Sequence, residues 1–164
     1  MRIILWLMSL TLAGVASAQS AYEMKGVVLM QPEYVLQERI TANDLVPYVG
    51  SLNAVAVEVF AANKLVPTGG FMVIAIKPGK RSAVWMDVKP ELPPSLSRAL
   101  IARLRAVAAP DVARGPVVFA LKTSIWGGAP PAQAMPSPRE WTEAAQKAAV
   151  PLEVDDVVER IWPR

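Results

Sequence analysis

The clearest pattern of apolar and polar positions lies in the middle of the chain. Residues 71–77 are apolar at almost every position, which is typical of a strand that is covered on both faces. In residues 82–88 apolar side chains alternate with others, which predicts a second strand. Pro78 between them favours a type I or II turn and a loop of about four or five residues. The pattern predicts an antiparallel hairpin with Ile74 and Ile76 in the core. The cations beside the turn are expected to form a solvated tip: Lys77, Lys80 and Arg81.

Helical spacing precedes this hairpin. Thr41 can start a helix, but Pro47 and Gly50 limit that helix to about one turn. A longer helix is expected to begin after Ser51 and to end near Ala62, because its alanines favour a helix over the strand that alternating valines would also fit. Apolar residues recur there on one helical face: Leu52, Val55, Ala56, Val59 and Phe60.

A second helix and a third strand follow the hairpin. Pro93 or Pro94 fits the first turn of a helix that ends before Pro110. Residues 117–126 then alternate between two faces and predict the third strand. The apolar stripe of the helix is Leu96, Leu100, Leu104 and Val107.

The order of these elements restricts the fold. The first strand of the hairpin is apolar on both faces and is best used at the centre of a sheet. When the third strand lies beside it and the helix crosses over in the right-handed sense, the order of strands is second–first–third. The predicted fold is therefore α+β, a small three-stranded antiparallel or mixed sheet with helices packed on one face.

An N-terminal arm precedes this domain, which we place at residues 51–126. The arm covers residues 19–50 and contains one apolar run, residues 26–30. Because Pro32 interrupts the arm and lacks the donor that a central strand needs, the run is either an edge strand or an ordered segment.

A Pro-rich linker, residues 127–138, and a helical segment, residues 139–164, follow the domain. Ser137 opens a capping box that places Pro138 at the first helical position. The apolar residues of a last short helix fall on one side: Val154, Val157, Val158, Ile161 and Trp162. These helices either dock on the domain itself or present an amphipathic face to a partner.

The first residues have the three parts of a secretory signal peptide. Met1 and Arg2 are followed by an apolar run to about Ala16 and by small residues before Gln19. The run is shorter than the ~20 residues that a membrane-spanning helix needs. We therefore expect residues 1–18 to be removed and the mature chain to reach the periplasm without a membrane span.

The amino-acid composition limits the kinds of catalytic and metal-binding site that the chain can form. The chain has no Cys and no His, so the commonest general bases, metal ligands and thiol nucleophiles are missing, and packing alone must stabilise the fold. Its 17 Lys and Arg against 14 Asp and Glu give a net charge of only +3, which does not predict nucleic-acid binding. Ser124 and Lys122 share a strand face, but such pairs are typical of ordinary surfaces. We expect no enzymatic activity, cofactor or metal, with a hydrolase as a weak alternative.

Residues 52–126 resemble the C-terminal domain of TonB, a periplasmic module of Gram-negative bacteria that reaches outer-membrane transporters. The similarity lies in a helix at residues 52–62, the strands FMVIAIKPGK and SAVWMDV, the helix SLSRALIARLRAV and the segment GPVVFALKTSIW. The resemblance implies a protein-binding module that accepts a peptide strand at the edge of residues 117–126. TonB has an uncleaved anchor and a long Pro-rich spacer, whereas the signal of this chain is expected to be cleaved, so no force transduction is implied.

These observations predict an exported interaction or adaptor module whose partners are other envelope proteins. An alternative is a structural subunit or assembly factor of an envelope complex, in which the chain self-associates and its tail inserts into neighbouring copies. The open edge of the third strand takes either a partner strand or the chain's own residues 25–30. The candidate partner-binding residues lie on one face of the third strand and on the tail: Val118, Ala120, Lys122, Ser124, Trp126, Val157, Ile161 and Trp162.

Overall fold

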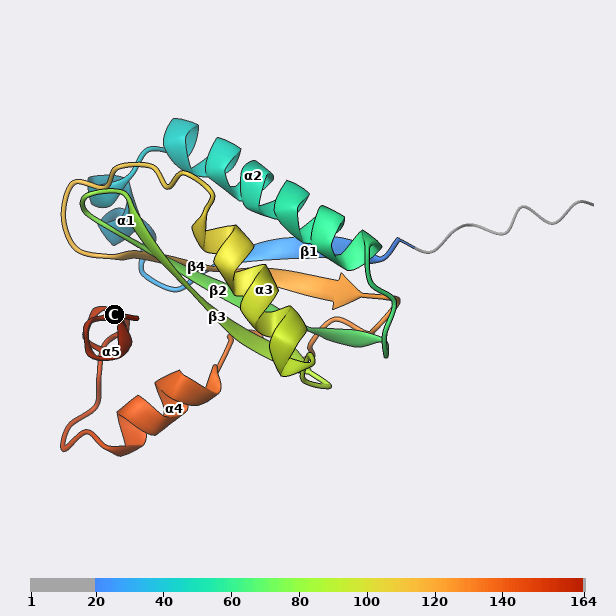
Figure 1. Cartoon of the computed structure of the whole chain (residues 1–164). Helices are drawn as coiled ribbons and strands as arrows, with labels where there is room; N and C mark the ends of the chain where they lie inside the picture. The colour runs from blue at the N-terminus through green and yellow to red at the C-terminus, as the bar shows by residue number, and fades with distance from the viewer. Residues whose placement is uncertain (1–19, 164) are drawn as a thin grey trace, which may run out of the picture.

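The computed structural model describes residues 20–163 and contains a four-stranded antiparallel sheet with helices on both faces (Figure 1). The strands are β1 (Tyr22–Leu29), β2 (Thr68–Lys77), β3 (Arg81–Lys89) and β4 (Val117–Ile125). The helices are α1 (Glu33–Arg39), α2 (Ala42–Ala61), α3 (Pro94–Arg105), α4 (Arg139–Gln146) and α5 (Val154–Ile161). The predicted signal peptide, residues 1–18, and the cut before Gln19 lie outside the described residues.

The order of the strands in the sheet is β1-β4-β2-β3. The predicted α+β class is confirmed, and so is the relative order of the three predicted strands, with β2 between β3 and β4. The prediction of only three strands is wrong, because β1 adds a fourth strand on the outer side of β4, where Leu29 lies opposite Phe119. β1 is the apolar run of the predicted arm, and it ends before Pro32, so the proline removes no hydrogen bond from the sheet.

β2 is buried at all 10 of its positions. Ile74 and Ile76, the predicted core residues, are fully buried under α2 and α3. Phe71 and Val73 lie on the other face, in a second core that α4 and α5 cover. The prediction placed the helices of the domain on one face and left the docking of the tail open; in the structure α2 and α3 lie on that face and the tail covers the second face (Figure 1).

α2 is one helix of 20 residues that begins after Thr41, so the prediction that Pro47 and Gly50 confine this region to a turn is wrong. A proline in a helix interior costs about 3 kcal/mol. Each large apolar side chain that α2 buries contributes about 1.5–3 kcal/mol, so packing against the sheet outweighs the cost of the proline. The buried residues of α2 are Tyr48, Leu52, Ala56, Val59 and Phe60.

Length and composition alone would also allow α2 to cross a membrane, and it is the one helix among residues 20–163 for which this holds. In the structure α2 lies along the sheet, with Leu52 and Phe60 fully buried. The core helix of a soluble protein meets the same criterion, so this feature is weak evidence for a membrane span.

The turn of the hairpin and the start of α4 differ in detail from the prediction. The hairpin loop has three residues, since Lys77 and Arg81 still pair, and Gly79 has the φ of 81° that a type II turn requires at this position. Pro138 occupies the cap position of α4 itself, so Ser137 forms no capping box there. The loop is therefore shorter than predicted, and α4 begins one residue later than predicted.

Replacing Ile74 with Ala should lower the free energy of unfolding by about 2–5 kcal/mol, because the change leaves a cavity at the centre of the sheet. Urea titration followed by tryptophan fluorescence measures this free energy. Val57→Ala on the exposed side of α2 is the control and should change it by less than about 0.5 kcal/mol. An unchanged urea midpoint for Ile74→Ala would contradict the central position of β2.

The stability of the fold should fall as the pH rises above about 10, where a tyrosine of the unfolded chain releases its proton. Burial raises the pKa of Tyr22 in the folded chain, where its hydroxyl has no hydrogen-bond partner among residues 20–163. Because the folded state keeps this proton to a higher pH, ionisation favours unfolding. Tyr22→Phe keeps a ring that can stack on Phe60 and should lose part of the alkaline destabilisation, measured as urea midpoints at neutral and at alkaline pH.

Tyr34→Phe, which removes the hydroxyl of an exposed tyrosine, is the matched control for this measurement. Burial also raises the pKa of Tyr48, which accounts for alkaline destabilisation that remains in Tyr22→Phe. An alkaline loss in Tyr22→Phe as large as in the parent chain would show that Tyr22 does not titrate in the way described.

Candidate functional site

The edge of β4 that the sequence left open is occupied by β1. Val28 lies opposite Ala120, and the Met30 amide donates to the Val118 carbonyl at 3.1 Å. Of the two occupants that the sequence allowed, the structure has the chain's own N-terminal segment. A partner strand can reach this edge of β4 only where β1 leaves it.

The predicted partner-binding residues inside β4 lie in the interior rather than on a free surface. Val118 and Ala120 are fully buried, and Lys122 is half-buried. Ser124 is buried as well, and its hydroxyl donates to the Gly128 carbonyl. That hydrogen bond fixes the linker after β4, which gives Ser124 a structural role next to Lys122.

Trp126 lies on the opposite face from the other predicted residues of this strand, so the prediction that they share a face is wrong. Its φ of 48° ends the regular alternation of the strand. Its ring lies 5.5 Å from the Phe60 ring between centroids, and its indole nitrogen donates to the Asn63 carbonyl at 2.6 Å. Trp126 therefore fastens the end of α2 to the sheet.

The predicted tail residues Val157, Ile161 and Trp162 pack on the face of the sheet that also carries Val118 and Ala120. We call this surface the tail face; it consists of Phe71, Val73, Ala75, Ala83, Trp85, Val118 and Ala120. Val157 is buried, and Ile161 and Trp162 are half-buried. Docking on the domain is thus the arrangement that the structure has, of the two that the sequence left open for the tail helices.

Asp155 fastens the start of α5 to the sheet. Its carboxylate accepts hydrogen bonds from the Gln31 side chain at 2.5 Å and from the Arg39 guanidinium at 2.7 Å. The Gln31 side chain also donates to the Pro116 carbonyl at 2.9 Å and accepts from the Val118 amide at 2.9 Å. Gln31 therefore continues the pairing of β1 with β4 and holds α5 at the same time.

Lys77 provides a second ionic contact to α5, so the prediction that it lies on a solvated tip is wrong. Its side chain is only 8% exposed, and its ammonium lies 2.6 Å from the Glu159 carboxylate. The same ammonium lies 4.4 Å from the centre of the Trp162 ring. A buried ammonium needs such partners, so Lys77 and α5 stabilise each other. This contact had no signal in the sequence, because the residue pattern did not predict the short loop that keeps Lys77 in the sheet.

The free edge of β3 borders the groove that is the candidate binding site. β3 is the last strand of the sheet, and none of the described residues adds a strand on its outer side. A groove of about 420 Å³ follows residues 84–89 along this edge. We call it the β3 groove; its walls come from α3 with the segment before it and from the start of α4, and they include Leu92, Ser97, Ile101, Arg139 and Glu140.

The two walls of the β3 groove differ in character. On the α3 side Ile101 presents an apolar side chain. On the α4 side the Asp87 carboxylate accepts from the Ser137 amide at 2.6 Å, and this contact holds the start of α4 beside the strand. Arg139 lies on the same side, where the hydrogen bond and charge of Glu143 raise the pKa of its guanidinium. Apart from Glu91 and Ser97, the α3 side is therefore apolar, whereas the α4 side is charged.

The open edge of β3 could have been predicted from the sequence. The predicted strand order already made β3 an outer strand. An open edge with few charges is poorly protected against an added strand, and this criterion applies to β3 as it does to β4. Between Ala83 and Val88 the strand has a single charged residue, Asp87. The walls had no such signal, because they come from segments far apart in the sequence.

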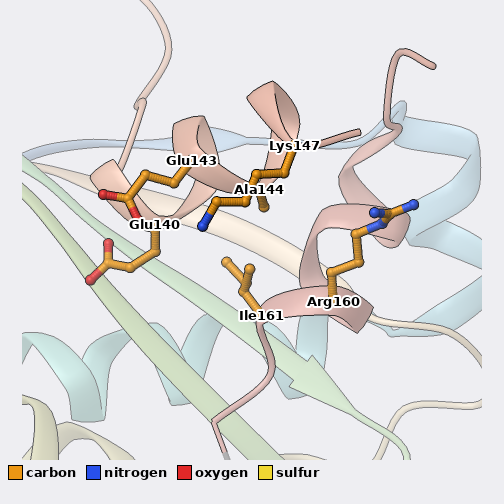
Figure 2. Close-up of a pocket in the computed structure, with 6 residues that line it drawn as sticks. All are labelled: Glu140, Glu143, Ala144, Lys147, Arg160 and Ile161. Atoms are coloured by element: carbon orange, nitrogen blue, oxygen red, sulfur yellow. The ribbon is translucent and has the colours of Figure 1, made fainter. Parts of the chain in front are cut away.

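A second, more open hollow lies between α4 and α5 (Figure 2). Ala144 and Ile161 supply its apolar part, and its charged residues are Glu140, Glu143, Lys147 and Arg160. Two carboxylates balance two cations here, so the hollow favours neither an anion nor a cation. Among residues 20–163, no group of three acidic side chains could hold a metal ion.

Comparison with known proteins adds no assignment: no family model matches the chain, and neither does a curated protein or a solved structure. The resemblance to the TonB C-terminal domain therefore stays a prediction. Function has to be inferred from the β3 groove and from the tail face.

Replacing Trp141 with Ala should loosen α4 and α5 and expose the segment between them to proteases. The Trp141 ring is 8% exposed and lies 5.6 Å from the Trp85 ring between centroids, so its removal leaves a cavity under α4. We expect faster trypsin cleavage after Lys147, measured by mass spectrometry. Glu140→Ala, on the exposed side of α4, is the control and should leave the cleavage rate unchanged. Equal cleavage of Trp141→Ala and the parent chain would contradict the docking of the tail through Trp141.

Proposed function

We propose that the chain is an exported protein-binding module that holds an extended segment of another envelope protein in the β3 groove. The observation that carries this proposal is the coincidence of a free strand edge with a groove of about 420 Å³ along it. An edge strand has unpaired backbone amides and carbonyls, and a segment that adds a strand there satisfies them. The affinity would come from backbone pairing and the specificity from the two walls.

The walls predict the character of the bound segment. Side chains of an added strand alternate between the two faces of the sheet. Those on the α3 side would meet Leu92 and Ile101, and those on the α4 side would meet Asp87 and Arg139. The favoured ligand is therefore a segment of about six residues in which apolar residues alternate with polar or charged ones.

The compartment and the adaptor role are supported by the sequence. The signal-peptide pattern of residues 1–18 supports export, and the resemblance of residues 52–126 to the TonB C-terminal domain supports recognition of a peptide strand in the periplasm. The strand edge proposed here is that of β3, since β1 occupies the outer edge of β4. The proposed adaptor transmits no force.

Peptides selected by phage display against the full chain should converge on the alternating pattern, and their binding should depend on the β3 groove. Ser97→Trp fills the groove from the α3 wall and should weaken the binding of a selected peptide by about ten-fold or more. Ala99→Trp, on the exposed side of α3 away from the groove, is the matched control and should leave the Kd unchanged. Fluorescence anisotropy of the labelled peptide measures the Kd.

Methylation of single backbone nitrogens in the selected peptide distinguishes strand addition from capture by side chains alone. Methylation should abolish binding where the peptide amide pairs with β3 and should be tolerated at the residues between, because only alternate amides face the neighbouring strand. The proposal is wrong if every methylated peptide binds like the parent peptide. It is also wrong if selected peptides bind the Ser97→Trp chain as tightly as the parent chain.

A further inference from the structure

α5 is a short helix that depends on the surface beneath it. It has 8 residues, of which Val157 and Val158 are buried. A helix of this length is unstable on its own in water, so α5 forms where a complementary surface receives it. We infer that the tail face receives α5 of a second copy of this chain in the same way, so that two chains exchange their last helices. This inference does not depend on the β3 groove.

The surface that receives α5 has charges complementary to those of the helix. We call this surface the α5 seat; it consists of the tail face with Arg39, Lys77 and Arg81. The seat places Arg39 and Lys77 in ion pairs with α5, and Arg81 lies 6.0 Å from the centre of the Trp162 ring. α5 carries one arginine, Arg160, against three acidic residues, Asp155, Asp156 and Glu159. The seat is therefore built for an acidic helix, and every copy of the chain carries the helix that fits it.

The spacing of the contacts adds specificity to this charge. Glu159 contacts the Lys77 ammonium at 2.6 Å, and Trp162, three residues later, covers the same ammonium at 4.4 Å from its ring centre. The Trp162 ring also lies 6.5 Å from the Trp85 ring. The seat thus selects a carboxylate followed by an aromatic ring at helical spacing, which α5 of a second copy supplies.

The segment between α4 and α5, residues 147–153, is suited to open. Among the described residues, the amides of Ala149, Val150 and Leu152 donate no backbone hydrogen bond, and Pro151 has no amide hydrogen to donate. Ala149, Val150 and Pro151 are exposed, Val150 at 64%. When extended, a segment of this length spans about 23–25 Å, which is enough to carry α5 to a neighbouring molecule.

The linker before α4 is held much more closely, so the exchange is limited to α5. A Cβ atom on Gly69 would lie 1.9 Å from the Ala129 carbonyl oxygen, which shows how tightly the linker crosses β2. The Ser137 amide donates to Asp87 at 2.6 Å, just before α4 begins. α4 therefore stays on its own sheet while α5 leaves.

The closed monomer and the exchanged dimer have the same contacts between α5 and the tail face. The balance between them is set by the hinge and by concentration. A short hinge gives a chain's own α5 an effective concentration on the order of 1 mM, so dilute chains close on themselves. Exchange is expected where chains are crowded together or where closure within one chain is weakened.

Two variants with reversed charges test the exchange. Lys77→Glu and Glu159→Lys each place like charges at a contact of 2.6 Å within one chain and so weaken closure. In an exchanged dimer of the two variants, opposite charges meet at both contacts, because each seat receives the helix of the other variant. Analytical ultracentrifugation should show the mass of two chains for the mixture and the mass of one chain for each variant alone.

The double variant Lys77→Glu/Glu159→Lys is the matched control, because it restores opposite charges within one chain. It should be a monomer whose segment between α4 and α5 resists proteases as in the parent chain. If the mixture has the mass of single chains while the double variant regains this resistance, α5 docks only within its own chain and the inference is wrong. It is also wrong if each single variant resists proteases as the parent chain does.

A measurement on the parent chain keeps the inference testable if a variant does not fold. Equal amounts of isotope-labelled and unlabelled chain are mixed at high concentration, and Lys77 is joined to Glu159 by a zero-length carbodiimide cross-link, which their distance of 2.6 Å permits. Exchange predicts cross-linked peptides that contain one labelled and one unlabelled partner. Cross-links confined to partners of the same isotope would overturn the inference.

Discussion

The full burial of β2 is the constraint on which the rest of the structure depends. A strand that is buried at all 10 positions needs a neighbouring strand on each side and a cover on each face. β3 and β4 are the neighbours, α2 and α3 cover one face, and α4 and α5 cover the other. The tail is therefore part of the core, since without it Phe71 and Val73 would be exposed as an apolar patch.

Among residues 20–163, the outer strands of the sheet are β1 and β3, because β4 is paired with β1 and β2 lies between β4 and β3. β1 has protection of the kind that proteins commonly use: its register shifts between Met24 and Gly26, and Lys25 forms an ion pair with Glu23 at 2.6 Å. β3 borders a groove, and its one central charge, Asp87, is bound to the linker. This difference between the two edges is the reason why β3 carries the functional proposal.

Local patterns predicted most of the elements, and long-range contacts decided what those patterns left open. β2 is a continuous apolar run, whereas β3 and β4 alternate between apolar and other residues. These patterns belong to each strand alone, so the three strands could be predicted without knowing their neighbours. The pairing of β1 could not be decided, because an apolar run beside Pro32 fits an edge and its partner lies far along the sequence. At Pro47 the burial of α2 outweighed the local preference of proline against a helix interior. At Trp126 a positive φ ends an alternation that the residue pattern continues. The β3 groove was the least predictable feature, since its walls come from separate segments that only the fold brings together.

α4 contacts both the β3 groove and the tail face, and β3 contributes residues to both. The first turn of α4 supplies Arg139 and Glu140 to the groove, whereas Trp141 of the same turn packs on Trp85 beside Trp162. Trp85 itself lines the groove and belongs to the tail face. If a bound segment shifts α4, it changes the affinity of the tail face for α5. Linkage then requires that the docking of α5 changes the affinity of the β3 groove for the segment by the same factor.

The anchoring of α4 limits this coupling. The contact of Ser137 with Asp87 and the edge-to-face contact of Trp141 with Trp85 both remain when α5 moves to another molecule, because neither involves α5. An exchanged dimer would therefore keep both β3 grooves intact, one on each chain. Two segments could then be held by one pair of chains, and binding of a segment that occupies both grooves at once would gain from the high effective concentration of the second groove. The proposed strand binding and the proposed helix exchange are in this way compatible within one chain: the first would supply recognition and the second a second binding site.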